Sequence, residues 1–224
     1  MKAVPSREPQ SDMPVVFVVD DDISIRESLE ALIEWAGWEP QTFGSAQEFL
    51  TAPRRSVPSC LVLDVSLPGL TGLELQNVIS TDQKDLPIIF ITGHGDIPMS
   101  VKAMKAGAVE FLTKPIDDEA LLNAIQHAIE RSKVALESEI ETEKLRGRYE
   151  SLTPREREIL LLVVSGLLNK QIGMKLGISE ITVKAHRGKL MQKMKADSLA
   201  DLVRMSVDLR LAPAGNPWRS SNLR

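Results

Sequence analysis

Short apolar runs alternate with amphipathic segments along the first 130 residues of this 224-residue chain. The runs are rich in β-branched residues, which predicts strands buried on both faces, as in a parallel sheet. Strands are expected at Val15–Val19, Cys60–Leu63, Ile88–Ile91 and Val109–Leu112, with a weaker run at Glu39–Phe43. Helices are expected between them at Ser24–Ala36, Ser45–Leu50, Gly72–Ser80, Pro98–Ala106 and Asp117–Glu130. This alternation predicts a doubly wound, flavodoxin-like α/β domain with a five-stranded parallel sheet over residues 14–130.

Residues 131–150 are densely charged and contain no proline. A helical stripe of apolar residues nearly continues through this segment, at Leu122, Ile125, Ile129, Leu136 and Ile140. Two interpretations are open: a solvated helical linker that extends the last helix of the α/β domain, and part of a dimeric coiled coil. The solvated helix is favoured because a coiled coil needs sustained heptads, which this segment lacks.

Strand patterns stop at Leu152, and a four-helix, all-α domain is expected over residues 151–211. Thr153-Pro154-Arg155-Glu156 is a helix start, with a capping Thr, Pro at the first helical position and Glu at the third. Helices are expected at about 154–165, 169–176, 180–194 and 198–210. The polar residues 1–13 are expected to form a disordered leader, and residues 212–224, which include Trp218, a flexible tail.

Charge is distributed unevenly between these two parts. Residues 1–147 carry 13 Lys and Arg against 24 Asp and Glu, a net charge of −11, whereas residues 148–224 carry 14 against 7, a net charge of +7. The basic part is therefore a candidate for binding nucleic acid. No apolar run approaches the ~20 residues of a membrane helix, and the single cysteine, Cys60, is typical of a reducing compartment. A cytoplasmic protein without a membrane partner is expected.

Acidic residues follow two of the predicted strands. Asp20, Asp21 and Asp22 come directly after the first strand, and Asp64 follows the run at Cys60–Leu63. Ligands of an open α/β sheet bind at the carboxyl ends of its strands, so these carboxylates are expected to converge on one crevice. Clustered carboxylates either bind a cation or raise one another's pKa, and oxygen ligands suit Mg²⁺. The sequence therefore predicts a magnesium site.

Two further polar groups follow neighbouring strands, the Thr92 hydroxyl and the Lys114 ammonium. Together with a bound cation, they would hold a phosphoryl group. A nucleotide is not expected, because Gly93 and Gly95 in TGHGD do not match a phosphate-binding glycine fingerprint. His94, beside this pocket, is expected to be a bystander.

The motifs VFVVDDD, LVLDVSLPGLTGLEL, IIFITGHGDIPM and VEFLTKP occur in this order and resemble the receiver domain of bacterial two-component response regulators. The resemblance implies that Asp64 is the phosphoacceptor and takes its phosphoryl group from a sensor histidine kinase. The implied Mg²⁺ ligands are Asp20, Asp21, Asp64 and the backbone carbonyl of Ser66. Slow self-dephosphorylation is implied too, but not the turnover of an enzyme.

The same resemblance implies a switch. Thr92 is its hydroxyl and Phe111 its aromatic residue, while Lys114 contacts the phosphoryl group. Thr92 is expected to move toward the phosphoryl group, and Phe111 to turn into the space that this opens. The Lys114–Pro115 peptide bond is expected to be cis. Asp22 is expected to cap the first helix instead of binding the metal.

A short helix, a turn at Gly177-Ile178 and a longer basic helix predict a helix-turn-helix motif in the second domain. In the longer helix, a core-facing stripe is expected at Val183, Leu190 and Met194, flanked by Ile181 and His186. The segment LTPREREILLLVVSGLLNKQIGMKLGISEITVKAHRGKLMQKM closely resembles the LuxR-type DNA-binding domain. This resemblance implies that residues 180–194 enter the major groove of double-stranded DNA.

Particular DNA contacts follow from this placement. Lys184 is expected to contact a guanine, Ala185 a thymine methyl group, and Lys189 either bases or backbone. Phosphate contacts are expected from Thr182, Lys170, His186 and Arg187. For His186, a packing role is the alternative. Gly188 replaces a longer side chain of relatives, which predicts weak readout at one base pair.

The whole chain most resembles response regulators of the FixJ/NodW/StyR type, with TGHGDIPMSVKAMKAGAVEFL as the most similar stretch. This implies an activator that dimerises on phosphorylation through Pro98–Lys105 and Val109–Phe111, binds an imperfect inverted repeat and works with RNA polymerase. Inhibition of the basic domain by the acidic domain before phosphorylation is a further option.

Two other classes of function are less well supported by the sequence. A Mg²⁺-dependent phosphatase or phosphotransferase would need a substrate cap, and a phosphorylation-independent DNA-binding protein would not need an intact acidic pocket.

Overall fold

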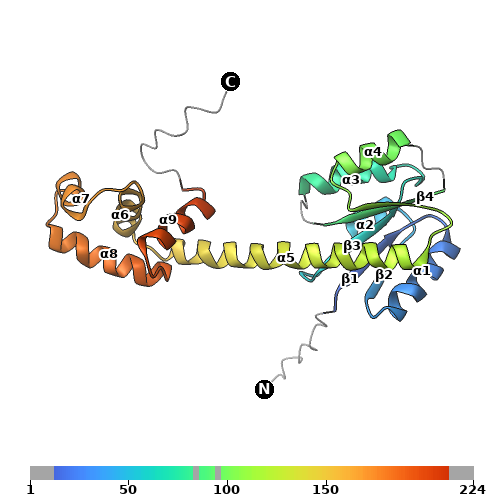
Figure 1. The fold of residues 1–224 in the computed structure, drawn as a ribbon, viewed down its shortest axis with the longest axis horizontal. Helices are drawn as coiled ribbons and strands as arrows, with labels where there is room; N and C mark the ends of the chain where they lie inside the picture. The colour runs from blue at the N-terminus through green and yellow to red at the C-terminus, as the bar shows by residue number, and fades with distance from the viewer. Residues whose placement is uncertain (1–12, 83–85, 94–96, 212–224) are drawn as a thin grey trace, which may run out of the picture. The chain divides into compact units, whose positions relative to one another are not determined.

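The computed structural model describes residues 13–82, 86–93 and 97–211 of the chain (Figure 1). Its first part contains a parallel sheet with the strand order β2-β1-β3-β4-β5. The strands are β1 (Val15–Val19), β2 (Glu39–Phe43), β3 (Ser59–Asp64), β4 (Ile88–Thr92) and β5 (Glu110–Thr113). This order confirms the predicted doubly wound fold. Because the chain adds β2 on one side of β1 and β3 on the other, the strand order reverses between β1 and β3.

Helices cover both faces of the sheet. One face carries α1 (Ile23–Trp35) and the first part of α5 (Asp118–Glu150), and the other carries α2 (Ala46–Thr51), α3 (Gly72–Asp82) and α4 (Ile97–Lys105). Side chains of β1 alternate between the two cores, with Val16 and Val18 toward α1 and α5, and Phe17 toward α2 to α4. Since both faces are covered, every residue of β1 and β4 is buried.

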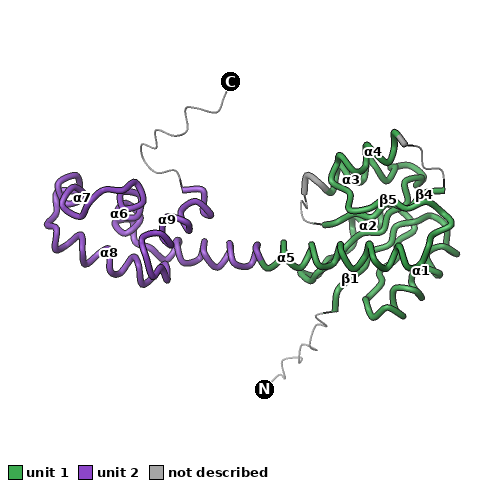
Figure 2. The backbone as a smooth tube through the Cα atoms, in the orientation of Figure 1, with its two compact units in different colours: residues 1–137 green, residues 138–224 purple. Residues whose placement is uncertain are grey.

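The helix α5 is continuous over 33 residues, which confirms that the last α/β helix extends through the charged connector. Its first part contributes apolar residues such as Ile125 to the core on the sheet. About two turns later, the buried Ser132 hydroxyl accepts a hydrogen bond from the Ser59 N–H, at 3.0 Å, where β3 begins. The chain divides into compact units of residues 1–137 and 138–224 (Figure 2).

The second unit is helical in its described part. It contains the end of α5 together with α6 (Pro154–Val164), α7 (Asn169–Leu176), α8 (Glu180–Met194) and α9 (Leu199–Asp208). Thr153 and Glu156 form the predicted capping box of α6. The core includes Val183, Leu190 and Met194, as predicted, and also Leu145 of α5. Ile181 was expected beside this stripe but is 80% exposed. It precedes Val183 by two positions, and residues two positions apart in an α-helix lie on nearly opposite sides of it.

The bounds of the other elements differ from the predicted ones by no more than two residues. Some expectations fall outside the described residues. These concern the leader up to residue 12, His94, and the tail at residues 212–224 with Trp218.

Candidate functional site

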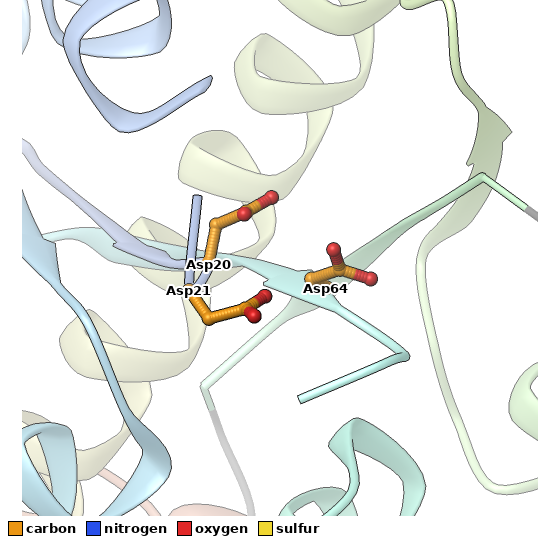
Figure 3. A group of neighbouring side chains, drawn as sticks. All are labelled: Asp20, Asp21 and Asp64. Atoms are coloured by element: carbon orange, nitrogen blue, oxygen red, sulfur yellow. The ribbon is translucent and has the colours of Figure 1, made fainter. Parts of the chain in front are cut away.

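Three carboxylates meet at the carboxyl ends of β1 and β3, where the strand order reverses (Figure 3). Asp20 and Asp21 follow β1 directly, and Asp64 is the last residue of β3. One carboxylate oxygen of each residue lies within 4.8 Å of those of the other two. Asp20 and Asp64 are buried, whereas Asp21 is exposed. The structure therefore brings together the three aspartates that the sequence predicts as metal ligands.

Lys114 follows β5 and reaches the same cluster. Its Nζ donates hydrogen bonds to Oδ2 of Asp20 and to Oδ2 of Asp64, both at 2.7 Å. Burial disfavours the charge of the lysine, but these hydrogen bonds and the attraction of both carboxylates outweigh it and raise the pKa of Lys114. Burial also raises the pKa of Asp20, although hydrogen bonds from Lys114 and from the Asp22 N–H oppose this. Lys114 is thus a cation shared by two carboxylates.

Backbone N–H groups orient the two buried aspartates. Oδ1 of Asp64 accepts a hydrogen bond from the N–H of Ser66 at 2.9 Å, and Oδ1 of Asp20 accepts one from the N–H of Asp22, also at 2.9 Å. The side chain of Asp22 is used elsewhere: it caps α1 by accepting a hydrogen bond from the Ser24 N–H at 2.8 Å, as predicted.

Two residues that the sequence did not single out complete this arrangement. Arg26 of α1 donates from Nη1 to the backbone carbonyl of Asp20 at 2.7 Å. Gly72 opens α3 so close to β3 that a Cβ there would lie 2.4 Å from the backbone carbonyl oxygen of Asp64. Only glycine fits this position without a shift of the backbone. The turn-forming residues of LPGLTG, which begin three positions after Asp64, are the sequence signal that points to it.

Thr92 and Phe111 lie on the neighbouring strands β4 and β5. Thr92 ends β4 and is fully buried, and its carbonyl accepts a hydrogen bond from the Lys114 N–H at 2.7 Å. Phe111 is paired with Phe90 in the strand register, with ring centroids 6.3 Å apart, and packs half-buried on the core beneath α2 to α4. The Lys114–Pro115 peptide bond is cis, as the resemblance implied.

The donor set of this site suits a hard divalent cation. Carboxylates at this separation repel one another unless positive charge is shared among them. Mg²⁺ prefers oxygen ligands and is usually held by one or two carboxylates, with water at its other positions. The exposed carboxylate of Asp21 and the neighbouring carboxylate of the buried Asp64 meet this requirement. The residues present therefore fit Mg²⁺.

The solvent-facing side of α8 is a second candidate site. Its exposed residues recur at helical spacing, at Ile181, Lys184, Ala185, Gly188, Lys189 and Gln192. Lys184 forms an ion pair with Glu180, one turn earlier, with Nζ 3.5 Å from Oε1. A Cβ at Gly188 would meet no atom within 4 Å, so this position is open. The predicted base-contacting residues Lys184, Ala185 and Lys189 thus share one stripe.

The residues predicted to contact phosphate are less uniform. Lys170 is exposed, whereas Thr182, His186 and Arg187 are half-buried. The Thr182 hydroxyl shares a hydrogen bond with Ser179 Oγ at 2.8 Å. Arg187 donates from Nη1 to Oδ1 of Asn169 at 2.9 Å, a contact between α8 and α7 that the sequence did not reveal.

Two protein families match the chain. The response regulator receiver domain matches residues 16–126, and the luxR family of bacterial regulatory proteins matches residues 150–206. Nodulation protein W of Bradyrhizobium diazoefficiens is 51% identical over 202 residues, which are 90% of this chain and 89% of that protein. Response regulator protein TodT of Pseudomonas putida is 44% identical over 196 residues, or 88% of this chain and 86% of that protein.

Solved structures show the same similarity. The response regulator StyR has a TM-score of 0.77 and 47% identity, covering 87% of this chain and 98% of its own. Full-length FixJ from B. japonicum has a TM-score of 0.51 and 39% identity, covering 88% of this chain and 98% of its own.

Among the described residues, no helix is both long and apolar enough to cross a membrane.

Proposed function

Because this chain belongs to the two-component response regulators that join a receiver domain to a LuxR-type DNA-binding domain, we propose that phosphorylation of Asp64 controls its binding to promoter DNA. A sensor histidine kinase supplies the phosphoryl group. The phosphorylated chain dimerises, binds an inverted repeat and activates transcription together with RNA polymerase. The observation that carries this proposal is the hydrogen bond between Lys114 Nζ and Asp64 Oδ2, at 2.7 Å.

The surroundings of Asp64 suit a carboxylate nucleophile. Its Oδ1 is held by the Ser66 N–H and its Oδ2 by Lys114, so the carboxylate is oriented before reaction. Transfer requires that charge on the equatorial phosphoryl oxygens be neutralised. Lys114 can exchange its bond to Asp64 for one to a phosphoryl oxygen. Mg²⁺, held by Asp20, Asp21, Asp64 and the Ser66 carbonyl, would contribute the remaining positive charge when bound.

The phosphoryl group is also the signal. It adds about −1.5 to −2 charges and new acceptor oxygens at Asp64. Thr92, buried at the end of the adjacent strand β4, turns its hydroxyl toward these oxygens, and Phe111 follows on β5. These two movements change the surface formed by α4 and β5. On α4, Val101 is 44% exposed and Met104 is 45% exposed. These apolar side chains support a dimer interface there.

The exposed stripe of α8 supports major-groove binding. A helix in the major groove reads bases with the side chains that face outward, and Lys184 can donate to guanine O6 and N7. Ala185 and Lys189 lie beside it on the stripe. Lys170, exposed on α7, contacts phosphate and positions the domain without specifying sequence. A two-fold dimer of such domains requires a two-fold DNA site.

Intact mass spectrometry after incubation with acetyl phosphate tests the first step. The wild type is expected to gain a single phosphoryl adduct with Mg²⁺ and none with EDTA, and Asp64→Asn to gain none. Asp22→Asn is the matched control, because it removes a neighbouring charge but keeps the oxygen that caps α1. An adduct on Asp64→Asn, or one that forms equally in EDTA, would contradict the proposal. Beryllofluoride, a phosphoryl mimic, then tests for the dimer.

A further inference from the structure

The half-buried Arg187 side chain connects the two helices of the helix-turn-helix motif. It lies on α8, and its Nη1 donates to Oδ1 of Asn169, the first residue of α7, at 2.9 Å. Arg187 is not part of the exposed stripe of α8. It is half-buried, whereas Lys184, three positions earlier, and Gly188, one position later, are exposed. Its guanidinium is therefore directed toward α7.

The helix α7 is held at its other end as well. Arg155 of α6 donates from Nη2 to the backbone carbonyl of Leu176, the last residue of α7, at 2.9 Å. Between the two ends, Gly173 lies so close to the turn that a Cβ would be 2.7 Å from the Ile178 carbonyl oxygen. Side chains from both neighbouring helices thus hold α7, and of these two hydrogen bonds the one from Arg187 comes from α8.

We propose that Arg187 is a positioning residue for DNA recognition: its hydrogen bond to Asn169 sets the angle at which α8 enters the major groove. This proposal rests on the proposed DNA binding, and it replaces the phosphate contact that the sequence favoured for Arg187. The bond pairs a charged donor with a neutral acceptor, which makes it stronger than a bond between neutral groups. Loss of the bond leaves the stripe residues intact but changes their orientation toward the base edges.

Positioning and phosphate contact have different consequences for binding. A lost phosphate contact weakens binding to all sequences and lowers the slope of log affinity against log salt by about 0.9 for each bound protomer. A lost positioning contact weakens binding to the preferred sequence more than to others and leaves this slope unchanged. The substitution Asn169→Leu separates the two, because it removes the acceptor without changing the charge of the protein.

The experiment uses the full chain with Mg²⁺ and beryllofluoride. The probes are a short duplex selected by the wild type from a randomised library and a scrambled duplex of the same composition. Fluorescence anisotropy across a salt series is recorded for Asn169→Leu, Arg187→Met, the double variant and Asn169→Asp, which keeps the acceptor oxygen. Lys170→Met serves as the control for a phosphate contact. Circular dichroism establishes that each variant is folded at the assay temperature.

We expect Asn169→Leu to lose about tenfold in affinity for the selected duplex per bound protomer, the lower end of what one hydrogen bond to a charged group contributes. The scrambled duplex should bind nearly as before, with the wild-type salt slope. Arg187→Met should show the same loss of preference, and the double variant no further loss. Asn169→Asp should retain the preference between the two duplexes, even if repulsion from phosphate weakens both.

Two results together would overturn the proposal. Asn169→Leu would prefer the selected duplex over the scrambled one as strongly as the wild type does, and Arg187→Met would show a lowered salt slope, as Lys170→Met does. Additive losses in the double variant would also overturn it, because they would show that the two residues act independently. If the library yields no duplex that the wild type prefers, the proposed DNA-binding function itself fails, which is a distinct result.

Discussion

Replacing Lys193 with methionine removes the cation that faces a buried carboxylate in the second unit. Lys193 lies near the end of α8, and its Nζ donates to Oε2 of Glu156 at 2.7 Å and to the Ser151 carbonyl at 3.2 Å. The Glu156 side chain is 3% exposed and the Lys193 side chain 36%. Methionine keeps most of the aliphatic stem, so the substitution chiefly removes the charge and its hydrogen bonds.

The expected loss of stability follows from what remains around Glu156. Its carboxylate keeps its hydrogen bonds with Thr153, including one from the Thr153 N–H at 2.9 Å, but loses the cation that Lys193 supplies. A hydrogen bond to a charged group contributes ~1.5–3 kcal/mol. Breaking a fully buried pair would cost more, but water can reach the half-buried end of Lys193 and screens part of the loss. We therefore expect Lys193→Met to destabilise the second unit by about 2 kcal/mol.

Hydrogen exchange measured by mass spectrometry on the full chain resolves this unit from the receiver domain. The most protected amides of α6 and α8 should exchange about tenfold to a hundredfold faster in the variant at pH 7. The hydrogen bond from Lys193 lowers the pKa of Glu156 in the folded state. Its stabilisation is therefore present above the unfolded pKa of about 4.3 and is lost as the pH falls through the lower folded pKa. The difference between wild type and variant should shrink below about pH 4.

Two further variants make this reasoning testable. Lys144→Met removes a lysine from the pair with Glu141, in which both side chains are more than half exposed, and should leave exchange unchanged. Adding Glu156→Gln to Lys193→Met should recover part of the loss, because a neutral amide can still accept the Thr153 N–H. Unchanged protection in Lys193→Met, or an effect that is as large at acidic pH as at pH 7, would refute the role of the buried charge.

Three other substitutions have defined expected outcomes. Gly72→Ala should destabilise the receiver domain by about 1–3 kcal/mol and reduce phosphorylation of Asp64, because its Cβ would lie 2.4 Å from a backbone oxygen; urea unfolding and mass spectrometry measure the two effects. Gly147→Ala should instead stabilise α5 by about 0.5–1 kcal/mol, since its Cβ meets nothing within 4 Å, and slower exchange there would show it. Lys114→Met should increase the affinity for Mg²⁺, measured by calorimetry, because the lysine no longer competes with the metal for Asp20 and Asp64. The same substitution should slow the phosphorylation of Asp64. An unchanged Mg²⁺ affinity would argue against this competition.

The sequence predicts most of the fold because its signals are local. Buried β-branched runs define the strands, and Asp22 and Thr153 mark helix starts through hydrogen bonds to residues two or three positions away. The acidic cluster is also predictable, because strand ends of a parallel sheet meet at one edge. Convergence of Asp20 and Asp64 then needs no knowledge of any individual long-range contact.

The contacts that the sequence does not reveal link residues far apart along the chain. Lys193 and Glu156 are 37 positions apart, and Ser132 and Ser59 are 73 apart. Each of these residues is polar and unremarkable in its own segment, so neither periodicity nor composition distinguishes it from a solvent-facing residue. Such pairs become visible only when the helices are packed, because packing decides which polar side chains are buried and must find partners.

The end of α5 shows how this affects the division into domains. Among the charged residues of the connector, Leu145 is 7% exposed and belongs to the core of the second unit, and Tyr149, one turn later, packs against that core. Arg157 of α6 donates to the Glu150 carbonyl at 2.7 Å and lies over the Tyr149 ring, with Cζ 5.2 Å from its centroid. A helix-turn-helix domain taken to start at residue 151 would lack these contacts. The helix that begins on the sheet of the receiver domain is therefore also part of the fold of the DNA-binding domain, and a change in α5 at either end acts on residues that stabilise a core.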